Sequence, residues 1–319
     1  MAREWHYWSR NKLDILAGYL SAFNQASGSL DERIYLDLMA GQPENADAVT
    51  GERFDGSARI ALDAIPGFTR HAFGELSVRN AASLEADLRT RHPLADFRVY
   101  PGDCNITIEA MLKELDPYRW APTFAFLDQQ AVELHWATLE KISAFRRSKK
   151  YKAEMWILCS PTMTNRGRRG TRGIGYGNNI TRFYGTPDWL CIERALDEDL
   201  LIPRQFRAEM VNLLRWRLHE QLGYKHTVRI PMHMKNNLEI YDMVFATDND
   251  AGLKIMSWLY GKAFEREPGM AAAAAAAKAG PPKYADDTLF DIDLPPTAMP
   301  TWQNEPAWDP RETIWWDLG

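Results

Sequence analysis

Residues 227–247 read TVRIPMHMKNNLEIYDMVFAT, two apolar runs separated by a short polar segment. Both runs, 227–234 and 239–247, contain the β-branched and aromatic residues that strands favour. Asn236 and Asn237 suit the positive φ values of a tight hairpin turn. The stretch therefore predicts an antiparallel pair of strands near the end of the folded body.

The sequence before this hairpin alternates between short apolar runs and segments with helical periodicity. Apolar runs at 34–40, 122–128 and 152–160 predict buried strands, and strands are also expected at 68–76 and 97–103. Helices are expected at 4–24, 56–65, 77–92, 105–115, 135–145, 204–222 and 251–264. Alternating strands and helices predict a parallel sheet, because each helix carries the chain back to start the next strand in the same direction.

The hairpin decides between the folds that have such a sheet. Simple doubly wound folds stay parallel to the end, whereas the methyltransferase sheet has an antiparallel last strand inserted beside its predecessor. We therefore predict an α/β protein with the Rossmann-like class I methyltransferase fold. Its sheet is expected to be mostly parallel and seven-stranded, with an antiparallel C-terminal hairpin strand.

Composition divides the chain into four segments. We expect an N-terminal helical extension (1–32), a Rossmann-like domain (33–265) with a basic insertion (161–185), an alanine- and proline-rich linker (266–285) and a tryptophan-rich tail (286–319). Trp315 and Trp316 are too apolar for a fully solvated tail, so we expect them to dock on the body or on a partner.

Four acidic residues follow four consecutive predicted strands, namely Asp37, Glu75, Asp103 and Asp128. Ligands of an open parallel sheet bind outside the carboxyl ends of its strands, so we expect these carboxylates to share one edge with a ligand. Singly, each also suits a turn or a helix cap, a common role for Asp after a strand. Their joint occurrence favours a binding site.

Three of these positions fit an adenosyl ligand. Glu75 is placed for the two hydroxyl donors of a ribose, and Asp103 for an adenine amine. Asp37 is expected to orient the loop at Gly41 and to hold the ammonium group of the ligand through this loop or water. GxGxxG is absent from AGQPEN (40–45), and no phosphate contact is required. The predicted cofactor is therefore S-adenosylmethionine (SAM).

Several motifs resemble, in order and spacing, the three-Cys-motif partner proteins (TcmP), over roughly residues 5–264. The matching pieces are YLDLMAG (35–41), Gly56 with Ser57, PGDCN (101–105), FAFLD (124–128), IYDMVFAT (240–247), and Trp8, Lys12, Leu13, Tyr19, Leu20 and Phe23 near the start. The resemblance implies a SAM-methyltransferase-like fold and a radical-SAM-like partner protein that carries a cysteine motif.

Asp128 is the predicted catalytic residue. It lies where methyltransferases that act on amines hold a residue that accepts hydrogen bonds from the target amine, and Gln129 and Gln130 add amide groups beside it. The alternative is that Asp128 caps the following helix. The chain has AGQP and FLDQQA where the family favours AGPG and FLDPYG, and these differences at the predicted site favour a non-catalytic role.

A basic loop follows the strand at 152–160 and is expected on the ligand edge. It reads NRGRRGTRG and contains Arg166, Arg168, Arg169 and Arg172. Arginine forks suit phosphates, and the glycines let the loop follow a nucleic-acid backbone. We predict that these arginines bind nucleic acid; an acidic protein surface or a solvated loop are the alternatives.

The whole molecule is not a basic nucleic-acid binder, because its formal net charge is −5 and any such surface must be local. A second basic cluster, from Arg146 to Lys152, is expected at the opposite edge of the sheet as a solvated helix end.

Cysteine usage and the N-terminus suggest a cytoplasmic protein. Cys104, Cys159 and Cys191 are widely spaced without CxxC, which predicts neither a disulfide framework nor a metal site. We find no signal peptide in MAREWHYWSRNK and no run of about 18 apolar residues, so no membrane association is expected.

The predicted function is that of a SAM-dependent methyltransferase-like protein that acts on or near nucleic acid. One alternative is a catalytically degenerate scaffold of the same fold, which recruits the cysteine-motif partner through the arginine loop or the tail. Another is a different nucleotide-using enzyme on this fold.

Overall fold

The computed structural model describes residues 3–5, 7–48, 50–148, 150–161, 173–233, 239–279, 305–313 and 315–316. The predicted nucleic-acid-binding arginines lie outside these ranges, namely Arg166, Arg168, Arg169 and Arg172. Asn236 and Asn237 of the predicted hairpin turn lie outside them as well.

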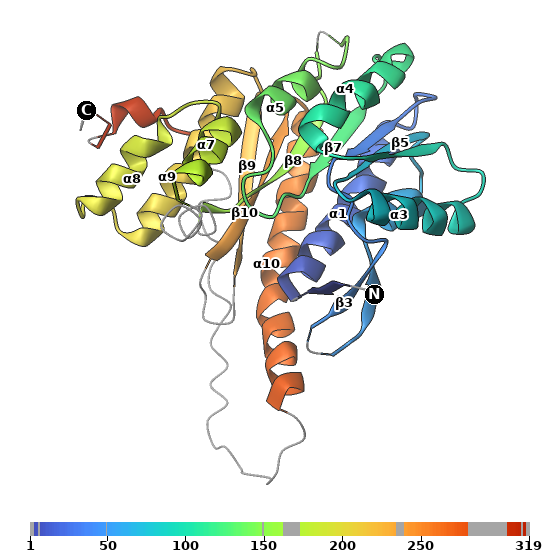
Figure 1. Ribbon diagram of the computed structural model, residues 1–319, viewed down its shortest axis with the longest axis horizontal. Helices are drawn as coiled ribbons and strands as arrows, with labels where there is room; N and C mark the ends of the chain where they lie inside the picture. The colour runs from blue at the N-terminus through green and yellow to red at the C-terminus, as the bar shows by residue number, and fades with distance from the viewer. Residues whose placement is uncertain are drawn as a thin grey trace.

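A seven-stranded sheet forms the centre of the molecule, in the order β6-β5-β2-β7-β8-β10-β9 (Figure 1). The strands are β2 (Ile34–Asp37), β5 (Arg70–Glu75), β6 (Phe97–Pro101), β7 (Thr123–Leu127), β8 (Glu154–Cys159), β9 (His226–His233) and β10 (Glu239–Thr247). The first five are parallel, and β10 is antiparallel to both of its neighbours, β8 and β9. This arrangement confirms the predicted Rossmann-like methyltransferase fold, with the last strand inserted beside its predecessor.

Helices cover both faces of this sheet and enclose two hydrophobic cores. One face carries α1 (Tyr7–Ala26), α2 (Ser57–Asp63), α3 (Val78–Arg91) and α10 (Asp250–Ala279). The other carries α4 (Cys104–Glu114), α5 (Trp136–Ser143), α7 (Gly173–Tyr184), α8 (Trp189–Asp197) and α9 (Pro203–Glu220). Successive strand residues alternate between the cores, as Tyr35 and Leu36 do, because side chains of a strand point to opposite faces.

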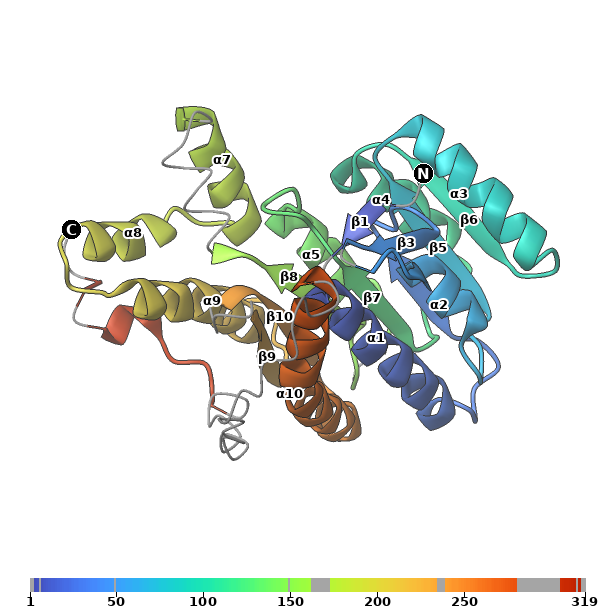
Figure 2. The ribbon, with the colours of Figure 1, turned by 90° about the horizontal axis from the view of Figure 1, so that it is seen from below.

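Two helices and a small sheet were not expected from the sequence. Helices α7 and α8 follow β8; α8 lies beside α9, and α7 packs against α5 and α8, away from α3 (Figure 2). Tyr176, Ile180 and Phe183 are buried at helical spacing in α7, but glycines around them conceal the pattern. The small sheet consists of β1 (Arg3–Trp5), β3 (Glu44–Asp47) and β4 (Arg53–Asp55), whose polar sequences contain no apolar run.

Helix α10 continues to Ala279, where the sequence led us to expect a linker from residue 266. The alanine-rich segment extends a helix that is already packed, and alanine has the highest helix propensity. Glu267 is buried and accepts a hydrogen bond from the backbone N–H of His233 (2.9 Å), which holds the helix to β9 beside Pro268. Figure 1 shows the C-terminal part of α10 projecting beyond the sheet. None of the described helices combines the length and apolarity needed to cross a membrane.

The described part of the tryptophan-rich tail, 305–313 and 315–316, packs on the body of the same chain. The Asn212 side chain in α9 donates to the carbonyl of Trp308 (2.9 Å) and accepts from its backbone N–H (3.0 Å). The indole of Trp308 donates to Glu209 (2.9 Å), and Trp315 is only 2% exposed within the core on this face. The tail therefore covers α9, which is one of the two outcomes expected for its tryptophans.

Replacement of Asn212 by alanine should destabilise the protein, because both backbone groups of Trp308 lose their partner. We expect Asn212→Ala to lower the free energy of unfolding by about 1–3 kcal/mol, measured by urea denaturation. In a chain that ends at Ala279 the same substitution should have a much smaller effect. Equal effects in the two chains would show that Asn212 does not act through the tail.

Candidate active site

The four predicted acidic residues lie along one edge of the sheet. Strands β6, β5, β2 and β7 are adjacent, and their carboxyl ends lead directly to Asp103, Glu75, Asp37 and Asp128 in that order. Topology thus places these residues at the edge where open α/β sheets bind ligands. Their surroundings differ, and these differences determine what each carboxylate can do.

Asp37 is fully buried and holds the loop that follows β2. It accepts hydrogen bonds from the backbone N–H of Met39 (3.2 Å), the hydroxyl of Tyr35 (3.4 Å) and the hydroxyl of Ser57. Burial raises the pKa of Asp37 to about 7, and the nearby charge of Asp128 adds to the increase. Its side chain is 0% exposed, so Asp37 orients this loop rather than contacting a ligand directly.

The loop after β2 covers the start of helix α2. Gly41 has a positive φ of 64°, which glycine adopts without steric cost. The backbone N–H of Gly56 donates to the carbonyl of Pro43 (2.8 Å), and a Cβ on Gly56 would lie 2.4 Å from the Gln42 carbonyl oxygen. Helix α2 has only seven residues, and this loop packs against its first turn. We therefore identify no site for the carboxylate of an adenosyl ligand at the start of α2.

Glu75 and Asp103 each keep one carboxylate oxygen available. One oxygen of Glu75 accepts from the backbone N–H of Ser77 (2.9 Å) and from Asn80 (3.4 Å). One oxygen of Asp103 accepts from the backbone N–H (2.8 Å) and side chain (2.9 Å) of Asn105 at the start of α4. Among the described residues, the second oxygen of each carboxylate has no hydrogen-bond partner. Asp103 thus caps α4, and Glu75 holds Ser77, the capping residue of α3; each carboxylate can still bind a hydroxyl or amine.

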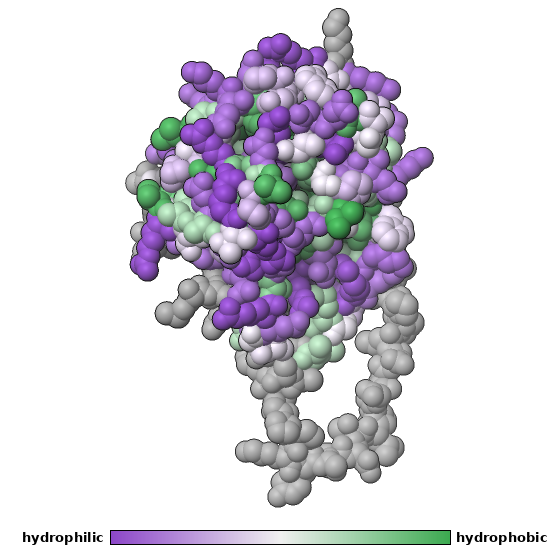
Figure 3. All heavy atoms as spheres, turned by 90° about the vertical axis from the view of Figure 1, so that its right-hand side faces the viewer, coloured by the Kyte–Doolittle hydropathy of each residue, from purple (hydrophilic) through white to green (hydrophobic). Residues whose placement is uncertain are grey.

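Exposed aliphatic side chains accompany these two acids. Leu76 directly follows Glu75 and is 73% exposed, Val78 is 71% exposed, and Ile106 in the first turn of α4 is 73% exposed. The face of the molecule on the side of α3 is otherwise mostly hydrophilic, with separate small apolar patches (Figure 3). We did not predict these residues. Helix caps and turns are usually polar, so apolar residues directly after an acidic residue at a strand end are a signal that could have identified them.

Asp128 forms a short ion pair with Lys12 of α1. The Lys12 ammonium lies 2.5 Å from both carboxylate oxygens, and its side chain is 5% exposed whereas that of Asp128 is 23% exposed. Lys12 also lies 5.5 Å from the ring centroid of Tyr241, whose buried hydroxyl has no partner within the described ranges. The predicted catalytic carboxylate is therefore already bound to a cation, a contact that sequence reasoning missed.

Gln129 has a structural role. It is 1% exposed, and its amide donates to the carbonyl of Leu158 (2.9 Å) and accepts from the backbone N–H of Leu134 (3.0 Å). It thereby ties the loop after β7 to strand β8. Because Gln129 is buried and its amide is bonded to the chain, it is not available for the contact with a substrate that we expected.

Cysteine and metal chemistry find no support in the described ranges. Cys104 and Cys159 are buried, and burial raises the pKa of each thiol to about 12. Neither thiol is therefore in the reactive thiolate form near neutral pH. No group of three or more potential metal-binding side chains comes together among the described residues.

Comparisons with known proteins add likeness at the level of the fold. No family model and no curated protein matches the sequence. A Legionella pneumophila protein of the family DUF519 aligns over 80% of this chain and 92% of its own, with 12% identity and a TM-score of 0.49. A Staphylococcus aureus protein described as a caffeoyl-CoA O-methyltransferase aligns over 71% and 81%, with 12% identity and a TM-score of 0.34.

A Pyrococcus horikoshii protein described as an RNA methyltransferase aligns over 72% of this chain and 82% of its own, with 10% identity and a TM-score of 0.29. These proteins are similar to the chain in fold only. The fold assignment therefore depends on the strand order described above, and the TcmP resemblance remains a resemblance of motifs.

Removal of the Lys12 ammonium should be costly, because it leaves Asp128 without its cation in a largely buried position. We expect Lys12→Met to lower the free energy of unfolding by about 3–5 kcal/mol, measured by urea denaturation. The double variant Lys12→Met with Asp128→Asn should recover part of this loss. Arg10→Ala, which breaks the exposed Arg10–Glu52 pair, is the control and should change stability much less. Equal effects of Lys12→Met and Arg10→Ala would contradict this account.

Burial of Asp37 should make stability depend on pH. The folded-state pKa is raised from 3.8 to about 7, so between these values the unfolded chain releases a proton that the folded chain retains. Stability therefore falls as pH rises through this window, by up to about 1.4 kcal/mol per pH unit, and is constant above it. Asp37→Asn removes this titration, so its stability relative to the unsubstituted protein should increase with pH up to about 7. Parallel stability curves in urea titrations at several pH values would disprove the assignment.

Proposed function

We propose that this chain binds SAM at the carboxyl edge of β6, β5, β2 and β7 and acts as a methyltransferase on or near nucleic acid. The observation that carries the proposal is the pairing of two available carboxylate oxygens, on Glu75 and Asp103, with the exposed aliphatic side chains of Leu76 and Ile106. A nucleoside presents hydroxyl and amine donors together with a flat apolar ring. These groups complement the two carboxylate oxygens and the aliphatic side chains.

The donor set fits the nucleoside half of the ligand. Glu75 would accept hydrogen bonds from the ribose hydroxyls, Asp103 would accept from the adenine amine, and Leu76 and Ile106 would pack against the ring. Asp37 would act indirectly, because it is buried and holds the loop at Gly41 through Met39. When bound, SAM supplies an electrophilic methyl group.

Asp128 would orient the acceptor at the next strand end. Its carboxylate oxygens are in contact with Lys12, so an acceptor amine reaches them only if the Lys12 ammonium shifts or shares them. Lys12 and Asp128 together would then place the acceptor and control its proton. The contribution of the protein would be chiefly the positioning of donor and acceptor.

The acceptor would be held by phosphates at the arginine loop. Arg166, Arg168, Arg169 and Arg172 follow β8, which ends at Cys159 on the same edge of the sheet as Asp128. A loop that leaves this edge would bind a polyanion beside the proposed methyl donor. Arginine forks bind phosphate oxygens in a bidentate manner, which is the reason to favour nucleic acid.

Two observations favour a second candidate, a catalytically degenerate scaffold that recruits a cysteine-motif, radical-SAM-like partner. Lys12 occupies the carboxylate that an acceptor amine needs, and the loop at Gln42 and Pro43 covers the start of α2. In this case the fold would serve as a binding platform, and methyl transfer would be absent.

Titration with S-adenosylhomocysteine by calorimetry tests the proposed cofactor site. Glu75→Ala should weaken binding about tenfold or more, because a carboxylate that accepts from the ribose is lost. Glu85→Ala removes an exposed acid elsewhere on α3 and should leave the affinity unchanged. Equal affinities of the two variants would remove the ribose assignment. The absence of binding to the folded, unsubstituted chain would favour the scaffold.

A further inference from the structure

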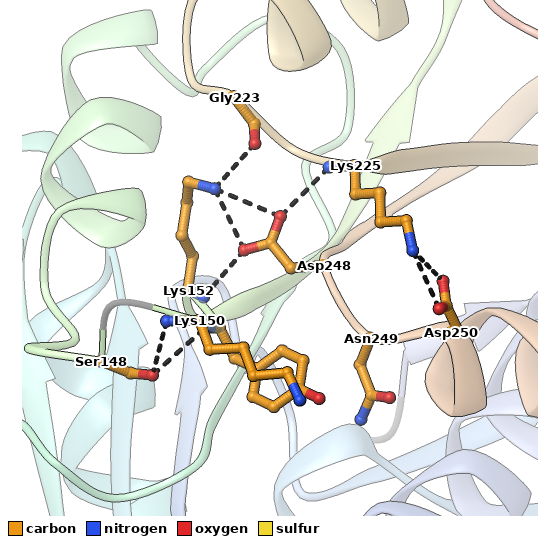
Figure 4. A pocket seen from close by; sticks show the side chains of 9 residues that line it. Ser148, Lys150, Lys152, Gly223, Lys225, Asp248, Asn249 and Asp250 are labelled. Atoms are coloured by element: carbon orange, nitrogen blue, oxygen red, sulfur yellow. Dashed lines mark hydrogen bonds and ion pairs between the residues drawn. The ribbon is translucent and has the colours of Figure 1, made fainter.

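A polar pocket lies at the opposite edge of the sheet from the proposed methyl-donor site. Its volume is about 480 Å³, and three loops form it, namely those before β8, before β9 and after β10 (Figure 4). Lys150, Lys152, Lys225, Asp248 and Asp250 supply its charged groups. The proposed function makes no use of this pocket.

Lys152 and Asp248 make the base of the pocket rigid. The Lys152 ammonium donates to the carbonyl of Gly223 (2.8 Å) and contacts both oxygens of Asp248 (3.0 and 3.2 Å). Asp248 also accepts from the backbone N–H groups of Lys152 (2.9 Å) and Lys225 (3.1 Å). The carboxylate is 9% exposed, so this network joins the three loops from below.

The rim of the pocket carries cations whose charge is less completely balanced by neighbouring acids. Lys225 pairs with Asp250 (2.6 Å), but this pair is more than half exposed and Asp250 also contacts His226 (2.5 Å). The exposed Lys150 ammonium lies 4.9 Å from the centroid of the Tyr151 ring, and no described acid forms an ion pair with it. Figure 4 shows Lys150 along the side of the pocket, away from the Lys152–Asp248 network.

The basic surface continues from this pocket to an exposed tryptophan. Arg146 donates to the carbonyl of Trp120 (3.2 Å), and the backbone N–H of Arg147 donates to the carbonyl of Arg119 (2.9 Å). Trp120 is 46% exposed, and the Arg147 side chain is 65% exposed. Asp116 is shared by Arg119 (3.3 Å) and Arg147 (3.5 Å), so one acid serves two cations.

We define the lysine–tryptophan surface as the pocket and this extension of it. It holds six cations and three acids, the cations being Arg119, Arg146, Arg147, Lys150, Lys152 and Lys225 and the acids Asp116, Asp248 and Asp250. Its net charge of about +3 contrasts with −5 for the whole chain, so this surface attracts a polyanion that the chain as a whole repels.

We propose that the lysine–tryptophan surface binds single-stranded nucleic acid, with phosphates at Lys150 and Arg147 and a base stacked on Trp120. Cations that follow a backbone, interleaved with exposed aromatic rings, are the arrangement by which proteins bind single strands without strong sequence preference. An acidic peptide would use the cations but would have no need of the exposed ring.

This inference rests on the proposed function for the choice of nucleic acid, and it deepens it by naming single strands as the substrate class. The surface lies at the amino end of β8, whereas the arginine loop follows its carboxyl end. The two surfaces are thus separate, and their contributions to binding can be measured independently.

The test is fluorescence anisotropy of the full chain with a labelled oligouridine of about twelve nucleotides over a range of salt concentrations. Arg147→Ala with Lys150→Ala should reduce the slope of log K against log salt by about 1.4, because two phosphate contacts are lost. Trp120→Ala should weaken binding about fivefold or more at every salt concentration and leave the slope unchanged, because stacking is not ionic. Lys262→Ala with Arg10→Ala removes the same charge from elsewhere and should change neither quantity.

Unchanged slope and affinity in both the Arg147/Lys150 and Trp120 variants would overturn the inference. Binding lost only when Arg166, Arg168, Arg169 and Arg172 are replaced by Ala would also overturn it, while it would support the proposed function. If polyglutamate displaces the oligonucleotide as well as unlabelled oligonucleotide does, and Trp120→Ala leaves the affinity unchanged, the surface binds acidic protein and the inference is overturned. If the chain binds S-adenosylhomocysteine but no oligonucleotide, both the inference and the proposed acceptor class fail, and the cofactor assignment stands.

Discussion

The insertion of strand β10 between β8 and β9 is the constraint on which the sites at both edges of the sheet depend. β10 pairs with β8 from Asp242 to Ala246 and with β9 along most of its length, so its backbone is bonded on both sides. Because β10 runs antiparallel, its first residues bring Tyr241 to the edge that holds Asp128, and the loop after it brings Asp248 to the opposite edge. One strand thus contributes to the candidate active site and to the lysine–tryptophan surface.

Helix α1 adds a second constraint, because it is fixed to the sheet by buried polar contacts. Its Tyr19 hydroxyl donates to the buried carboxylate of Glu154 (2.6 Å), which also accepts from Thr247 (2.6 Å), and its Lys12 contacts Asp128. Desolvation raises the pKa of Glu154, and hydrogen bonds from the two hydroxyls oppose this increase. A movement of α1 that freed Asp128 would therefore also disturb the centre of the sheet, which couples the acceptor position to the packing of the first helix.

The seven strands of the large sheet were predictable because strands such as β2, β7 and β8 are apolar runs, and the hairpin indicated the antiparallel end. The same reasoning placed Asp37, Glu75, Asp103 and Asp128 on one edge, since topology alone determines which strand ends meet. It could not reveal that Lys12 pairs with Asp128, because the two residues are 116 positions apart and neither is unusual locally. Nor could it indicate the polar strands β3 and β4, whose side chains carry no periodic signal.

The docked tail affects the order in which the protein can be completed during synthesis. Asn212 and Trp308 are 96 positions apart, and Trp315 packs in the core that contains the buried face of α9. Chains fold from the N-terminus as they leave the ribosome, so the part of this core that Trp315 covers stays open to solvent until the tail has emerged. In that interval the part of α9 around Glu209 and Asn212 is available to chaperones or to aggregation, and a chain released early would keep it exposed.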